Sequence, residues 1–241
     1  MRFWGQVWHA SVSNHVRVFA YRLAHAALPC RAMSAGMRGL PRSQAVCGGC
    51  DAGFRGGRGR PLESYTHLFL ECPSFAAAMD WLLDVWQHIK GSRPPKDARV
   101  IIAADPAAAW PPASMPPADV QLWTALRLML LYHVWAARGS QDVQQRSAAV
   151  AVRAAIAAIR REVELQFNRL RLEGGRGADL PPRLRRITAP LQAPCSFDDV
   201  WKRSGLVRVD PPVAAGGQPR LVVLLSDSWP VPAPAPPAGP P

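Results

Sequence analysis

The sequence predicts a mainly α-helical protein: a small metal-stapled helical domain, then a hairpin of long helices, with an irregular proline-rich linker and tail. Two observations carry this prediction. In several stretches apolar residues recur at intervals of three and four, which is the spacing of a helix with one buried face. In addition, the pair Cys47 and Cys50 is followed by His67 and Cys72, and such sets of side chains bind metal ions.

The first helix is predicted over residues 13–28. Its apolar residues step by three and four, Pro29 ends the pattern, and a short helical turn over 31–37 should follow. Trp4 and Trp8 precede the helix and are expected to pack on its apolar stripe. This stripe consists of Val16, Phe19, Leu23 and Ala26.

Four side chains, written Cys47-x2-Cys50-x16-His67-x4-Cys72, match the spacing of a structural zinc site. The glycines between the first two cysteines allow a tight turn that aims both sulfurs the same way. An imidazole and a third thiol would complete a tetrahedron around Zn²⁺ and leave no open position for water. We therefore predict one Zn²⁺ held by these four residues, with a structural role.

Two other interpretations of the cysteines remain open. Five scattered cysteines could include one close pair by chance, although the N-terminus has no secretion signal and thus favours reduced thiols. His25 and Cys30 repeat the x4 spacing and form a rival ligand pair, whereas a helical histidine most often faces solvent or a neighbour. Cys195 is expected to be an ordinary free thiol.

Residues 51–60, between the two ligand pairs, are rich in glycine and arginine. Arg55, Arg58 and Arg60 could contact a phosphate backbone, and Phe54 could stack on an unpaired base. The alternative is a flexible insertion that only links the two halves of the metal site, and the shortness of the run favours it. Weak binding of RNA or single-stranded DNA is the functional hypothesis for this loop.

A further helical stripe begins after Pro73, where Ser74 can cap a helix that Gly91 ends. Its apolar residues are Phe75, Met79, Leu82, Val85, Trp86 and Ile89. An aromatic stripe at this spacing is usually packing, so this helix should dock on the metal site. Residues 1–91 are therefore predicted to form one zinc-stapled helical domain.

The same domain contains an ordered series of motifs. They are Trp8, Val16-Arg17-Val18-Phe19-Ala20-Tyr21-Arg22-Leu23, Leu28-Pro29, Cys47-x2-Cys50, Glu63-Ser64-x2-His67-Leu68-Phe69-x2-Cys72-Pro73 and Trp81. This series resembles the zinc-binding domain that follows the reverse transcriptase in many non-LTR retrotransposons. The match covers a little over a third of the chain and departs at Cys30, where the family more often has Thr. The resemblance implies a zinc-binding, retrotransposon-derived module.

Residues 92–117 form a predicted Pro/Ala linker with one short apolar run, Val100-Ile101-Ile102. Residues 118–175 carry two helical stripes separated at Gly139, which predicts a helical hairpin. The stripes are Leu122, Trp123, Leu126, Met129, Leu130, His133 and Val134, then Val152, Ile156, Ile159, Val163, Phe167 and Leu170. The second helix, predicted over 142–173 with Asp142 as its cap, is long enough to reach a partner helix.

Residues 176–241 form a basic, proline-rich tail that is predicted to be largely disordered. Two short elements are expected within it. They are a helix that starts at Asp198-Asp199-Val200-Trp201 and a strand over 221–225.

The formal charge of +12, from 29 Lys and Arg against 17 Asp and Glu, is compatible with a nucleic-acid partner. The excess is spread along the chain, and GC-rich codons would produce the same Arg, Ala, Gly and Pro content. The most apolar run, Leu122 to Ala137, is interrupted by Arg127 and His133 and is too short to cross a bilayer. We expect an intracellular protein, nuclear or cytoplasmic, with no membrane partner.

No catalytic motif is evident in the sequence. It contains no phosphate-binding glycine loop, no His-Glu-x-x-His and no Gly-x-Ser-x-Gly, and Asp198-Asp199 lacks the preceding aromatic residue of a polymerase motif. An enzyme is therefore not expected. The first hypothesis is a non-catalytic module that touches RNA or DNA. The others are a structural or protein-interaction domain in which zinc only holds the fold, and a degenerate element fragment.

Overall fold

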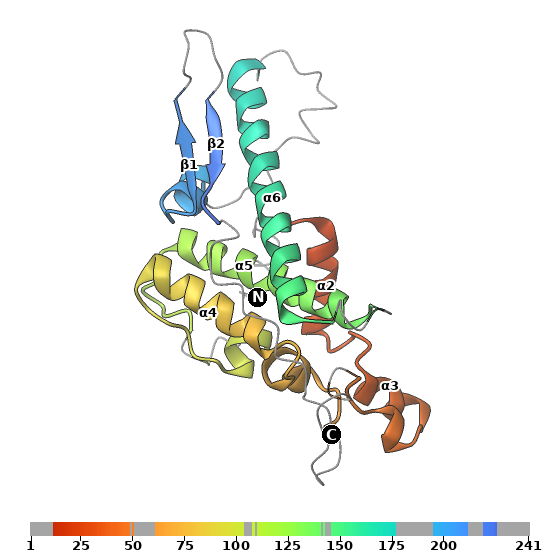
Figure 1. The fold of residues 1–241 in the computed structure, drawn as a ribbon. Helices are drawn as coiled ribbons and strands as arrows, with labels where there is room; N and C mark the ends of the chain where they lie inside the picture. The colour runs from red at the N-terminus through yellow and green to blue at the C-terminus, as the bar shows by residue number, and fades with distance from the viewer. Residues whose placement is uncertain are drawn as a thin grey trace, which may run out of the picture.

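The structure is a computed structural model that describes residues 12–48, 50, 61–103, 108, 110–140, 142, 146–176, 195–211 and 219–225, apart from the side chains of residues 42 and 171–176. The elements are α2 (Asn14–Ala24), α3 (Arg31–Arg38), η1 (Arg42–Gln44), η2 (His67–Glu71), α4 (Ala76–Lys90), η3 (Arg99–Ala103), α5 (Pro117–Arg138), α6 (Ala148–Arg176), η6 (Asp198–Lys202), β1 (Val207–Asp210) and β2 (Arg220–Val223) (Figure 1). The predicted mainly α fold is confirmed. Trp4 and Trp8 lie outside the described residues.

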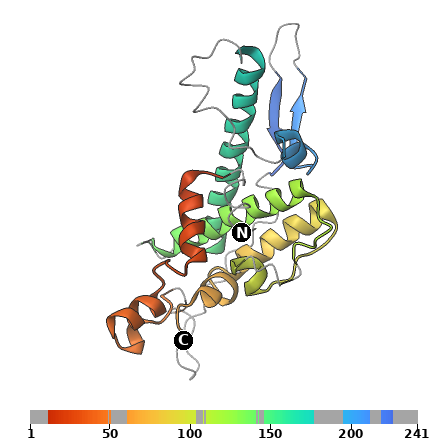
Figure 2. The ribbon, with the colours of Figure 1, turned by 180° about the vertical axis from the view of Figure 1, so that it is seen from behind.

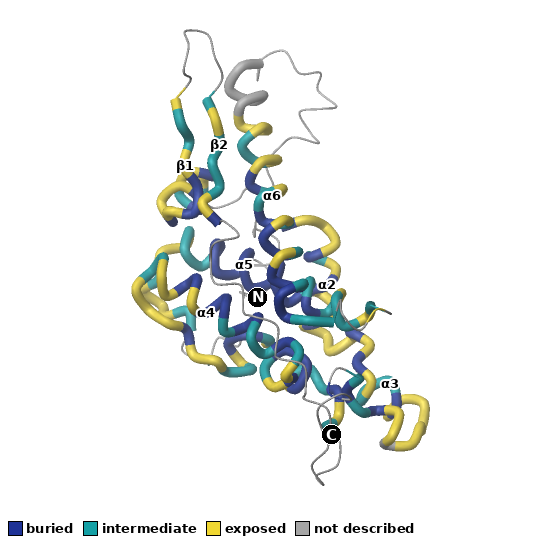
Figure 3. Tube along the Cα trace, viewed as in Figure 1, coloured by how far each residue is buried: buried dark blue, intermediate teal, exposed yellow. Residues whose placement is uncertain are grey.

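Helix α5 is the centre of the fold. Helices α2, α4 and α6 all pack against it, and Figures 1 and 2 show them arranged around it from both sides. Every side chain from Gln121 to Leu131 is buried, so α5 is enclosed over most of its circumference (Figure 3). Among the described helices, however, none is both long and apolar enough to cross a membrane.

Helix α6 runs at a steep angle to α5 (Figure 1). Its predicted apolar stripe is buried only as far as the middle of the helix. The stripe residues Val152, Ile156, Ile159 and Val163 are buried, whereas Leu165 and Leu170 are exposed. The helix begins at Ala148, six residues after the predicted cap Asp142. Ala148 donates its backbone N–H to the carbonyl of Ser74 at 2.7 Å, which fixes this start beside the turn before α4. The carbonyl of Ser74 is thus bonded to the start of α6. Helix α4 has no side-chain cap hydrogen bond at its N-terminus, although Ser74 was predicted to cap it.

The apolar run predicted within the linker is held to α5 by a buried arginine. Val100 and Ile101 are buried in η3, and Arg127 of α5 donates from Nη1 to the carbonyl of Ile101 at 2.8 Å. Burial lowers the pKa of the Arg127 guanidinium to about 10. Its partner is a neutral carbonyl, and no carboxylate among the described residues pairs with it to oppose this shift. The linker therefore contributes to the common core at this point.

Residues 195–211 and 219–225 of the tail, where a short helix and a strand were expected, contain secondary structure. These segments form η6 and a two-stranded antiparallel sheet, with Val207 opposite Val223 and Asp210 opposite Arg220. Buried side chains from them join the core, because they are the apolar members of an otherwise polar, proline-rich sequence. These side chains are Phe197, Val200, Trp201, Leu206, Val207 and Leu225. The short helix at Asp198 and the strand near 221 were expected, while β1 was not.

Candidate metal centre

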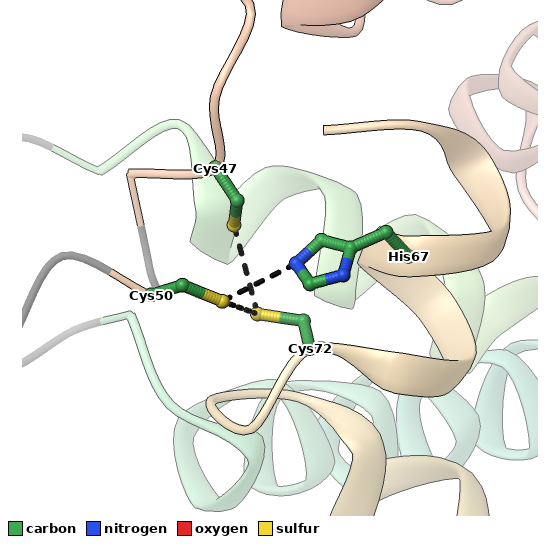
Figure 4. A group of neighbouring side chains, drawn as sticks. All are labelled: Cys47, Cys50, His67 and Cys72. Atoms are coloured by element: carbon green, nitrogen blue, oxygen red, sulfur yellow. Dashed lines mark hydrogen bonds between the residues drawn. The ribbon is translucent and has the colours of Figure 1, made fainter. Parts of the chain in front are cut away.

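Two short segments bring four potential ligands together. Cys47 and Cys50 follow η1, His67 is the first residue of η2, and Cys72 directly follows η2 (Figure 4). The backbone N–H of Cys47 donates to the carbonyl of Pro61 at 3.0 Å, and the preceding residue forms an antiparallel bridge with Leu62. This pairing aligns the cysteine segment with the segment that leads into η2. All four side chains point toward one another (Figure 4).

The spacing of the donor atoms matches a tetrahedral site. The Sγ atom of Cys72 lies 3.7 Å from Sγ of Cys47 and 3.8 Å from Sγ of Cys50. The Sγ atom of Cys50 lies 3.2 Å from Nε2 of His67, and all four donor atoms lie within 4.8 Å of one another. Two sulfurs at about 2.3 Å from one tetrahedral zinc ion lie about 3.8 Å apart. A disulfide would require about 2.05 Å, so the thiols are free.

Burial makes the cluster a poor place for bare thiolates. All four residues are buried, and Cys72 has no exposed surface. The hydrogen bond with Cys47 and then burial raise the pKa of the Cys72 thiol far above its usual range. A cation between the sulfurs would favour the thiolate form instead. The donor set of three soft sulfurs and one imidazole therefore fits a metal ion of the zinc type.

A carboxylate outside the cluster lies near the second ring nitrogen of His67, beyond hydrogen-bond distance. Nδ1 of His67 lies 3.8 Å from Oε2 of Glu71, one helical turn later, while Nε2 faces Cys50. The backbone N–H of His67 also donates to Oγ of Ser64 at 3.0 Å, which fixes the start of η2. Here Nε2 is the ring nitrogen available to a metal.

Behind the cysteine pair lies a buried carboxylate between two arginines, which the sequence analysis missed. Glu63 is 1% exposed and accepts a hydrogen bond from the backbone N–H of Arg31 at 2.9 Å. Nε of Arg138, at the end of α5, lies 3.4 Å from the same carboxylate oxygen. Burial raises the pKa of Glu63, and the Arg31 N–H and the Arg138 charge oppose that rise. The cluster is thus tied to both α3 and α5.

The guanidinium group of Arg31 packs on the turn between the first two cysteines. It donates from Nη1 to the carbonyl of Val46 at 3.2 Å. A Cβ atom at position 48 would lie 2.7 Å from Arg31 Nη2, so Gly48 allows this close approach. The sequence contains no local signal for this contact, because Arg31 lies 15 residues before Val46. A positive charge therefore lies next to the candidate ligands.

The other predicted site residues lie elsewhere. Cys30 is buried as the N-cap residue of α3 and does not belong to the four-residue cluster, and Cys195 is partly buried. His25 is exposed at the end of α2, with its ring centroid 4.5 Å from that of Tyr21. Among the described residues, the rival pair therefore forms no ligand cluster. The loop residues Phe54, Arg55, Arg58 and Arg60 lie outside the part of the chain that the structure describes.

Comparisons with known proteins give no independent assignment of the site. No protein-family model, no curated protein and no solved structure matches the chain. The metal-binding chemistry of the four-residue cluster therefore rests on its own geometry and surroundings.

Proposed function

We propose that this protein is a retrotransposon-derived zinc-binding module that binds single-stranded nucleic acid weakly and catalyses no reaction. The observation that carries the proposal is the buried cluster of three thiols and one imidazole, with Sγ atoms 3.7 and 3.8 Å apart. The order of motifs around this cluster, which resembles the domain that follows a non-LTR reverse transcriptase, supports the proposed origin.

Zinc is the proposed ion because of the ligand types and their surroundings. Soft thiolates with one imidazole in a tetrahedral arrangement are typical of structural zinc sites. Three thiolates, one neutral imidazole and Zn²⁺ carry a formal charge of about −1. The guanidinium of Arg31, packed on the Cys47–Cys50 turn, would offset that charge. Cys47, Cys50, His67 and Cys72 would hold the ion.

A structural role follows from the number of ligands. Four protein ligands fill a tetrahedral zinc ion and leave no position where water or substrate could bind. The zinc ion would cross-link segments 47–50 and 67–72. The ion would thereby fix the two ends of the arginine-containing loop 51–60.

Nucleic-acid binding is supported by charge and by the position of that loop. The chain carries 29 Lys and Arg against 17 Asp and Glu. Arg55, Arg58 and Arg60 lie between two anchored ends, and the N–H of Cys47 bonded to the carbonyl of Pro61 brings those ends together. Single strands should bind better than duplex, because Phe54 can stack only on an unpaired base.

A structural or protein-interaction role is the second candidate. It is favoured by the distal half of α6, where Leu165 and Leu170 are exposed although the proximal stripe is buried. A partner helix would find apolar contacts there. In that case zinc only holds the fold, and the protein would not bind nucleic acid.

Binding of a labelled single-stranded RNA between about 50 and 200 mM salt tests the proposal. The parent should bind, and affinity should fall as salt rises, because phosphate contacts release counterions. Replacing Arg55, Arg58 and Arg60 together by Gln should lower the slope by up to about three contacts of roughly 0.7 each. A matched variant with Arg153, Arg169 and Arg203 replaced by Gln removes equal charge elsewhere. Absence of binding by the parent would favour the structural role.

A further inference from the structure

A pocket of about 390 Å³ lies between α2 and the C-terminal half of α5. Its volume is within the usual range of ligand pockets, about 300–1,000 Å³. It lies outside the metal cluster and shares no residue with it. Its apolar lining consists of three aromatic residues, Phe19, Tyr132 and Trp135, together with Val18 and Leu28.

The aromatic rings are fixed by contacts with one another. The ring centroid of Phe19 lies 5.7 Å from that of Tyr132, in an edge-to-face arrangement. It lies 5.9 Å from that of Trp135, at a tilted angle. Phe19 itself is buried, while Tyr132 and Trp135 are partly accessible. The pocket therefore presents preformed aromatic surface.

The rim of the pocket is polar and positively charged. Asn14, His15 and Arg22 line it from α2, and none of the described lining residues carries a carboxylate. The exposed Arg22 has no ion-pair partner among the described residues. Moreover, the first 50 residues of the chain contain six Arg and neither Asp nor Glu. A negatively charged ligand with a flat apolar part suits these surroundings.

We propose that this pocket binds one unpaired base of a single-stranded nucleic acid, with Arg22 at an adjacent phosphate. The aromatic wall would contact the face of the base, and Asn14 and His15 would offer hydrogen bonds to its edge. The proposal rests on the nucleic-acid binding proposed above and adds a second contact beyond the loop. An acidic peptide would pair with Arg22, but its affinity would not depend on the aromatic wall.

Two single substitutions test the pocket in the full-length, metal-loaded protein. Tyr132→Leu keeps apolar volume and removes the stacking surface, and it should weaken binding of an oligouridine by roughly tenfold. Arg22→Gln should weaken binding less and lower the salt slope by about 0.7, one single-strand phosphate contact. Arg153→Gln, an exposed change on α6 outside the pocket lining, is the matched control. Thermal unfolding shows whether each variant is folded.

Photochemical cross-linking gives a readout that does not depend on variant stability. Oligouridine that contains 4-thiouridine should cross-link to the peptides with Phe19 or Tyr132 in the parent protein. If cross-links map only to residues 51–60, and Arg22→Gln binds like the Arg153→Gln control, the pocket proposal is overturned while the proposed function stands. If the parent binds no oligouridine, both proposals fail. Displacement of oligouridine by an acidic peptide, with unchanged affinity of Tyr132→Leu, would also overturn the pocket assignment.

Discussion

The segment around the metal cluster and the helical body that follows it are held together in different ways. Among the described residues from Pro29 to Thr66, the buried side chains are small or polar. They are Cys30, Ala35, Ala45, Cys47, Cys50 and Glu63. In α4, α5 and α6, by contrast, buried Leu, Ile, Val, Met and Trp side chains form a continuous core. The first segment therefore has little apolar area to hold it without its ligand cluster.

Magnitudes show why this difference matters. Burial of one large apolar side chain contributes about 1.5–3 kcal/mol, and the helical body has many such side chains. Zinc binding in small structural sites is worth about 10–16 kcal/mol at neutral pH. One ion would thus replace several missing core residues in the segment from 29 to 66. The segment around the metal cluster and the helical body should therefore respond differently to metal removal and to core mutation.

Metal removal is expected to have the largest effect. A strong zinc chelator should abolish amide protection in residues 29–66, because the segment loses an interaction of about 10–16 kcal/mol. Protection in α5 and α6 should persist, since their core is apolar. Hydrogen exchange followed by mass spectrometry measures both regions at once, and added zinc should restore the first. Unchanged exchange in 29–66 would mean that the cluster does not hold this segment.

A buried charge in α6 should have the second-largest effect. Ile159 is 1% exposed, so Ile159→Asp should lower the free energy of unfolding by about 3–5 kcal/mol. Leu165→Asp is the matched control on the same helix, because Leu165 is 60% exposed. The control should change stability by less than about 0.5 kcal/mol. Urea denaturation measures both, and equal midpoints for the two variants would contradict the packing described for α6.

Alanine substitutions at two glycines should change the stability in opposite directions and by smaller amounts. Gly91 ends α4 with φ of +72°, so Gly91→Ala should cost about 1–2 kcal/mol. Gly36 lies inside α3, and a Cβ there would meet nothing within 4 Å. Gly36→Ala should therefore stabilise the protein by about 0.4–1 kcal/mol, if α3 unfolds with the rest of the chain. Thermal unfolding in the presence of zinc distinguishes the two signs.

Acid sensitivity of the helical body should be the smallest effect. Burial and then the charge of Arg161 lower the pKa of His133 below its usual 6.5. The unfolded chain therefore binds a proton near pH 6.5 that the folded chain does not. The stability that His133 contributes is present above pH 6.5 and is lost as the pH falls below it. His133→Gln should lose less stability than the parent between pH 7 and 5 in urea denaturation, and an equal loss would contradict this assignment.

The helices were predictable because their signals are local. The stripes of α2, α4, α5 and the first half of α6 follow from spacings of three and four, and Gly91 marks the end of α4. The predicted end at Pro29 is wrong, because α2 ends at Ala24 and Ala26 has a positive φ. The start of α6 was placed six residues too early. Ser147 accepts a hydrogen bond from the backbone N–H of Val150 there, and Ala148 donates to the distant Ser74. Strand β1 in the tail was missed as well. Its short apolar segments, such as Val207–Val209, are too brief to stand out in proline-rich surroundings.

The four cluster residues were predictable from spacing, but their surroundings were not. The Cys-x2-Cys turn and the His-x4-Cys pair each have a short-range pattern. The carboxylate of Glu63 depends on Arg31 and Arg138, which are far from it in the sequence. The aromatic pocket likewise joins Phe19 with Tyr132, across more than a hundred residues. Such contacts arise only from the packing of α2 against α5 and from the link that Glu63 makes between Arg31 and Arg138.

The metal content of the purified protein tests the central claim most directly. Elemental analysis should find one zinc ion per chain in the parent and in Cys30→Ser, because Cys30 lies outside the cluster. Cys50→Ser should lose most of the zinc and the protection of residues 29–66. A parent without zinc, or a Cys50→Ser protein with undiminished zinc, would contradict the assignment of Cys47, Cys50, His67 and Cys72 as the ligands that hold this region together.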